Sequence, residues 1–129
     1  MSEKIKSYKE LIVWQKAMEL NLLVYKLTNS FPENEKFALI SQIRKSSISI
    51  PSNIAEGWGR FSNKSFGQFL KIARGSLYEL ETQLIIAKNL NYINELYEIE
   101  NLLVEMSKML YSLIETLDSK NYSKNKDLI

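Results

Sequence analysis

The chain has 129 residues, of which 45% are hydrophobic and 25% are charged, and its net charge is +2. This is the composition of one globular domain. The chain has no His and no Cys, which excludes Ser-His-Asp and Cys-His nucleophiles, the usual zinc sites and imidazole acid–base catalysis. The four glycines do not fit a nucleotide-binding loop either. The sequence therefore predicts a protein that is not an enzyme and that holds no cofactor and no metal.

No apolar run reaches the roughly 20 residues that a helix needs to span a bilayer. The first ten residues, MSEKIKSYKE, lack the apolar core of a signal peptide. We therefore expect a cytoplasmic protein that does not bind membranes.

The first helix is predicted from about Tyr8 to Thr28. Its apolar residues recur at steps of three and four, as one face of a helix does; they are Leu11, Trp14, Met18, Leu22 and Tyr25. Four consecutive apolar residues also occur at 11–14 and at 22–25, so this helix is apolar on more than one side. A small bundle covers one stripe of each helix, which predicts that a second subunit covers the rest.

Pro32 ends the first helix, and the second is predicted from about Glu35 to Gly57. Its apolar stripe passes through Pro51 without losing phase; the stripe is Ile40, Ile43, Ser47, Ile50, Ile54 and Trp58. A turn at the proline would reset the phase, so the pattern predicts a helix that is kinked at Pro51. We expect Gly57 and Gly59 to close it as C-terminal glycines do.

The third helix is predicted from Ser62 or Asn63 to about Asn89, with a core face of Phe66, Phe69 or Leu70, Ala73, Leu77, Leu80, Leu84 and Ala87. Gly67 and Gly75 lie inside it, and we interpret them as points where another backbone comes close.

The fourth helix follows Asn94, a predicted N-cap. It has a heptad seam of Leu96, Ile99, Leu103, Met106, Leu110, Leu113 and Leu117. Residues 118–129 are polar and lack periodicity, so we expect a flexible tail. The whole pattern predicts an all-α, antiparallel up-down four-helix bundle in one domain, residues 1–117.

Five segments carry a resemblance to a known family, namely LIVWQKAMEL (residues 11–20), VYKLTNSFP (residues 24–32), QIRKSSISIPSNIAEGWGR (residues 42–60), FLKIARGSLYELETQL (residues 69–84) and NYI (residues 91–93). Together they resemble the bacterial four-helix-bundle proteins first noted in intervening sequences of 23S rRNA genes, also described as S23 ribosomal proteins. The resemblance implies a cyclic homopentamer without known enzymatic activity or cofactor. A related branch of this family is the accessory variability determinant of diversity-generating retroelements. Members of that branch are basic pentameric barrels that bind nucleic acid, so the resemblance implies nucleic-acid binding as one role to test.

Eight residues of these motifs are interpreted as structural rather than catalytic: Pro51, Ser52, Asn53, Glu56, Gly57, Gly75, Ser76 and Glu79. We expect Glu79 to accept a hydrogen bond from a Ser or Asn of the second helix, or to pair with an Arg.

Basic residues on the second and third helices form a candidate edge for RNA or DNA. Residues 1–90 carry 13 Lys and Arg against 8 Glu, so the positive charge is concentrated there. The candidates are Arg44, Lys45, Arg60, Lys64, Lys71, Arg74 and the stacking residue Tyr78. A ring would repeat this edge by symmetry and raise affinity for a polyanion. The same pattern also fits solvated helix faces. Two roles therefore stay open: nucleic-acid binding, or a structural scaffold that binds a protein partner.

Overall fold

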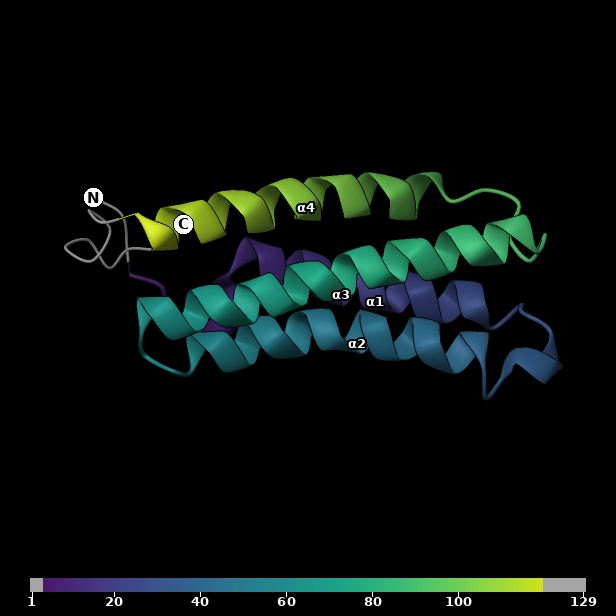
Figure 1. The fold of residues 1–129 in the computed structure, drawn as a ribbon, viewed down its shortest axis with the longest axis horizontal. Helices are drawn as coiled ribbons and strands as arrows, with labels where there is room; N and C mark the ends of the chain where they lie inside the picture. The colour runs from purple at the N-terminus through teal and green to yellow at the C-terminus, as the bar shows by residue number, and fades with distance from the viewer. Residues whose placement is uncertain (1–3, 120–129) are drawn as a thin grey trace.

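The computed structural model describes residues 4–119, which form four α-helices and no strand. The helices are α1 (Ile12–Thr28), α2 (Leu39–Trp58), α3 (Asn63–Asn89) and α4 (Tyr97–Asp118). Short 3-10 helices precede the first two, η1 (Tyr8–Glu10) and η2 (Glu33–Glu35). The α2–α3 turn lies at one end of the molecule, and the α1–α2 and α3–α4 connections lie at the other (Figure 1). The all-α prediction is thus confirmed for the described part of the chain.

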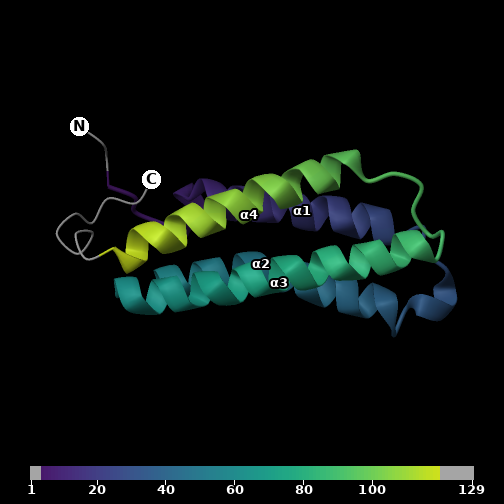
Figure 2. The ribbon, with the colours of Figure 1, turned by 45° about the horizontal axis from the view of Figure 1, so that its top comes forward.

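Each helix packs against two neighbours. Both α1 and α3 contact α2 and α4, whereas α1 and α3 are diagonal to each other. Figure 2 shows the same arrangement, with α1 and α4 on one side of the bundle and α2 and α3 on the other. It follows that the surface formed by α1 and α2 lies opposite the surface formed by α3 and α4. None of the described helices has a stretch long and apolar enough to cross a membrane.

The apolar stripe predicted on α1 is only partly buried. The buried stripe of the helix consists of Val13, Ala17, Leu20, Val24 and Thr28. Leu11 of the predicted stripe is buried, but Met18 and Leu22 are 45% and 58% exposed. Because α1 carries apolar side chains around most of its circumference, periodicity alone did not select the buried side. The helix also begins at Ile12 rather than Tyr8, since residues 8–10 form η1 and Leu11 is extended.

The second helix has the predicted core stripe but a later start. Glu33–Glu35 form η2 and Ala38 is not helical, so α2 begins at Leu39 instead of Glu35. Ile43, Ile50 and Ile54 are fully buried. The helix is continuous through Pro51, which is itself buried.

The glycines at the end of α2 do not close it in the expected way. Neither takes a positive φ; the left-handed residue of the α2–α3 turn is Phe61, at φ 58°. Gly57 is instead required by packing, because a Cβ at this position would lie 2.6 Å from Cβ of Phe69 on α3. The prediction that another backbone comes close to Gly75 is wrong within one chain, since a Cβ at this position would meet no atom within 4 Å.

The third helix begins as predicted, because the Ser62 side chain accepts a hydrogen bond from the Ser65 N–H at 3.2 Å. Of the two alternatives at the core position, Leu70 is buried and Phe69 is half-buried. The fourth helix does not use Asn94 as its cap; Leu96 occupies that position and has no capping side-chain bond.

The seam of α4 is buried as expected except for Leu113, which is half-buried. Asp118 still belongs to α4, although the tail was predicted to begin there. Residues 120–129 of the predicted tail lie outside the described residues.

A hydrogen bond ties the α3–α4 connection to η2. The Tyr92 hydroxyl donates to Oε2 of Glu35 at 2.7 Å. This bond to the carboxylate raises the pKa of Tyr92 above its usual value, because ionisation would both break the bond and place a second negative charge beside Glu35. The hydrogen bond therefore holds the α3–α4 connection to η2 at every pH at which the Tyr92 phenol keeps its proton.

Two glycine substitutions test the packing. Gly57→Ala should destabilise the fold by about 1–3 kcal/mol, because the new methyl group has no room beside Phe69. Gly75→Ala should stabilise it by about 0.5–1 kcal/mol, because that position is open and Ala favours helix. Urea unfolding of both variants measures the difference. Equal midpoints would contradict the close α2–α3 approach.

Candidate functional site

The motif residues on α2 and α3 form a largely buried polar seam between these two helices. The Ser49 and Ser76 hydroxyls are 2.8 Å apart. The Asn53 side chain donates to the Ser49 carbonyl at 2.8 Å and to its hydroxyl at 2.9 Å. Ser46 donates to Oε1 of Glu79 at 3.3 Å, as expected for Glu79. These contacts connect α2 to α3, which fits a structural reading of the motif. Three other residues of the motif, Ser52, Glu56 and Gly75, are exposed to solvent.

The predicted basic edge is divided among several surfaces and much of it has intramolecular partners. Arg60 pairs with Glu56 at 2.8 Å, and Lys71 pairs with Asp118 at 3.5 Å. Arg44 faces α1, where its Nε donates to the Thr28 hydroxyl at 2.9 Å.

The guanidinium of Arg44 also lies 4.4 Å from the ring centroid of Tyr25. By contrast, Lys45 and Lys64 are exposed and have no partner in residues 4–119. The structure therefore leaves two of the six candidate cations unpaired.

Arg74 and Tyr78 do lie together, in a cleft between α3 and α4. The Arg74 guanidinium carbon is 5.1 Å from the ring centroid of Tyr78 and 5.4 Å from that of Tyr111. Arg74 donates to the Tyr78 hydroxyl at 3.0 Å, and this hydroxyl is 2.8 Å from the hydroxyl of Ser107. Tyr111 and Ser107 could not be predicted from the sequence, because their contacts depend on how α4 is aligned with α3.

This cleft is not strongly positive. Its volume is about 400 Å³, and its charged lining residues are Lys71, Arg74, Glu115 and Asp118. Two acidic and two basic groups balance, which does not favour a polyanion. The tyrosines, which could stack on bases, instead contact Arg74.

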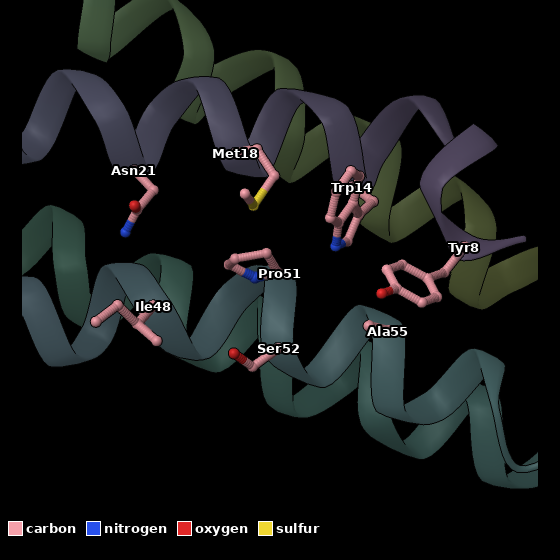
Figure 3. A pocket seen from close by; sticks show the side chains of 8 residues that line it. All are labelled: Tyr8, Trp14, Met18, Asn21, Ile48, Pro51, Ser52 and Ala55. Atoms are coloured by element: carbon pink, nitrogen blue, oxygen red, sulfur yellow. The ribbon is translucent and has the colours of Figure 1, made fainter.

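A second hollow, here called the α1–α2 groove, is mainly apolar (Figure 3). It has a volume of about 320 Å³ and is lined by Tyr8, Trp14, Met18, Asn21, Ile48, Pro51, Ser52 and Ala55. The Tyr8 and Trp14 rings meet edge to face at 5.3 Å between centroids. Met18 and Ile48 are each 45% exposed at its surface. Trp14 and Met18 of the groove belong to the apolar stripe that the sequence indicated on α1, whereas the buried residues of α1 lie on another side of the helix.

The model of the family described as 23S rRNA-intervening sequence protein matches residues 9–112. Among solved structures, the chain is similar to a protein of unknown function from the S23 ribosomal protein family of Bacteroides thetaiotaomicron VPI-5482. The two share 29% sequence identity and a TM-score of 0.74, over 81% of this chain and 96% of that chain. No curated protein matches the chain.

The polar seam can be tested at Ser76. Ser76→Ala removes the hydrogen bond to Ser49 and should lower the free energy of unfolding by about 0.5–1.5 kcal/mol. Ser41→Ala is the matched control, because Ser41 is exposed on α2 and its side chain has no hydrogen bond in the described residues. Both changes raise helix propensity alike. If the two variants unfold at the same urea concentration, the hydrogen bond between Ser49 and Ser76 does not stabilise the fold.

Proposed function

Because the chain belongs to the 23S rRNA-intervening sequence protein family, which its match over residues 9–112 establishes, we propose that it is a non-enzymatic scaffold that assembles from copies of itself into a ring. In this proposal the subunit is an up-down antiparallel bundle that bends at Pro51, and five copies close the ring, as the resemblance implies. A protein partner then binds to the assembled ring.

The observation that carries this proposal is the apolar surface of α1. Trp14 and Met18 open into the α1–α2 groove, and Leu22 is more than half exposed on the same helix. Contiguous apolar surface of this kind marks a site of protein association. The α3–α4 surface also carries exposed apolar side chains, Val104 and Tyr111 among them. A head-to-tail ring needs two such different surfaces on each copy.

The acidic groups of the motif region support a role without turnover. Glu56 pairs with Arg60, and Glu79 accepts a hydrogen bond from Ser46. The chain has no His or Cys that would work with them. Their contacts are those of residues that hold helices and turns together.

Assembly is tested by sedimentation of the full chain in solution. A pentamer has a mass of about 75 kDa, five times the 15.0 kDa of one chain. We expect a single species near this mass that persists on dilution to micromolar concentration. A compact species with the mass of one chain at all concentrations would refute the proposal.

Nucleic-acid binding is the second candidate, and the unpaired cations Lys45 and Lys64 favour it. A ring would present several copies of each, so that modest charge becomes a multivalent surface. The intramolecular partners of Arg44, Arg60 and Lys71 argue for the scaffold as the better-supported role. A functional link to the retroelement accessory proteins would belong to this second candidate.

The second candidate predicts a site-specific effect of charge reversal. Lys45→Glu together with Lys64→Glu should weaken binding of single-stranded RNA at low salt and reduce the dependence of affinity on salt, because each lost phosphate contact lowers the slope of log affinity against log salt by roughly 0.7. Lys26→Glu together with Lys88→Glu changes the net charge equally at two other exposed lysines. Filter binding across a salt series compares the two. Equal losses in both double variants would exclude a localised site.

A further inference from the structure

The fourth helix exposes a regular line of large side chains, here called the α4 ridge. It consists of Tyr97, Val104 and Tyr111, which are 69%, 52% and 54% exposed. Residues seven apart lie on nearly the same side of a helix, so these three form one line along α4. Val104 and Tyr111 lie next to α3, where Tyr111 contacts Arg74. Tyr97, at the start of the helix, instead lines a hollow with Leu23 and Leu27 of α1. It is distinct from the buried heptad seam of the same helix.

The α4 ridge and the α1–α2 groove lie on opposite sides of the molecule. This follows from the packing order, in which α1 is diagonal to α3 and α2 is diagonal to α4. Figure 3 looks onto the groove with α1 and α2 in front and the other two helices behind them. No ridge can therefore reach the groove of its own chain.

The shapes of the two surfaces are complementary. Along α2 the groove runs from Ile48 to Ala55, seven residues, or about 10 Å at 1.5 Å per residue. Val104 and Tyr111 have the same separation on α4. The groove contains the compact residues Pro51, Ser52 and Ala55, between the larger Trp14, Met18 and Ile48. A tyrosine ring or a valine fits a depression of this kind, and the Met18 sulfur suits contact with an aromatic ring.

The charges of the two surfaces are also complementary. The helices α1 and α2 contain four basic and two acidic residues, whereas α3 and α4 contain five basic and seven acidic ones. The two halves therefore carry +2 and −2, and α4 alone carries one Lys against five acidic residues.

Unpaired charges border the two apolar surfaces. Lys45 lies one turn from Ile48, at the edge of the groove. Glu100 and Glu115 lie one turn from Val104 and Tyr111, at the edge of the ridge. These three side chains have no ion-pair partner in the part of the chain that the structure describes. Complementary charges at the rim of an apolar contact orient the two partners.

We propose that the α4 ridge of one copy seats in the α1–α2 groove of the next copy. This inference rests on the proposed function and names the two surfaces that join the ring. Because ridge and groove differ and face away from each other, the contact is heterologous, and an open assembly of any length has one free groove at one end and one free ridge at the other. Repetition of the contact continues until the ring closes. A second copy is the occupant, since the length of the groove and the positive charge of α1 and α2 around it both match this chain's own α4.

Two variants on opposite surfaces test the contact. Met18→Asp places a charge in the groove, and Val104→Asp places one in the middle of the ridge. Each should weaken association more than about tenfold and sediment as single chains, because the carboxylate loses its water in an apolar contact. Both positions are about half exposed, so the helices should form normally, which circular dichroism checks. Ile86→Asp is the control, at an α3 position that is 44% exposed outside both surfaces, and should keep the wild-type mass.

Mixing the two variants gives the decisive result. The Val104→Asp chain keeps an intact groove and the Met18→Asp chain keeps an intact ridge, so an equimolar mixture should form a dimer with one chain of each. Larger species should be absent because the remaining surfaces are blocked. A mixture that stays monomeric, or a variant that keeps the wild-type mass, would overturn the inference. A wild-type chain that is itself monomeric would instead refute the proposed assembly.

Discussion

The close contact between α2 and α3 is the constraint on which the rest of the bundle depends. At Gly57 the two helices approach so closely that even a methyl group would meet Phe69. This proximity brings the hydroxyls of Ser49 on α2 and Ser76 on α3 within hydrogen-bonding distance. It also helps to keep α2 helical through Pro51, where a proline costs about 3 kcal/mol in a helix interior. Burial of Ile50 and Ile54 on either side of the proline offsets this cost.

The pattern of apolar residues was sufficient for three of the four helices. In α2, α3 and α4 the apolar residues at steps of three and four outline one dominant side, so the period of 3.6 residues selects the buried side correctly. In α1 no side is clearly polar, and the stripe chosen from the sequence contained Met18 and Leu22, which the structure exposes. The helix starts were harder because they depend on turn geometry. Residues 33–38 form a 3-10 turn and a non-helical link before α2, and α4 begins without a capping side chain.

The candidate site could be predicted only in part. Periodicity correctly placed Lys71, Arg74 and Tyr78 near one another, because all three lie on one helix. It gave no information about Asp118 and Tyr111, which α4 brings to the same cleft. These two residues change its chemistry, since one neutralises Lys71 and the other covers Arg74. Whether a basic helix face attracts a polyanion is thus decided by the neighbouring helix, and the sequence of the face itself cannot reveal it.

The α2–α3 turn has a consequence for the stability of a single chain. Phe61 holds a left-handed backbone conformation at φ 58°, and its side chain is 96% exposed. A bulky residue in this region is strained by about 1–2 kcal/mol, a penalty that glycine would avoid. The other left-handed residue, Asn91, is of a type that tolerates the conformation. Since the aromatic ring in the α2–α3 turn gains almost no burial within its own chain, the folding of one bundle does not account for its presence there.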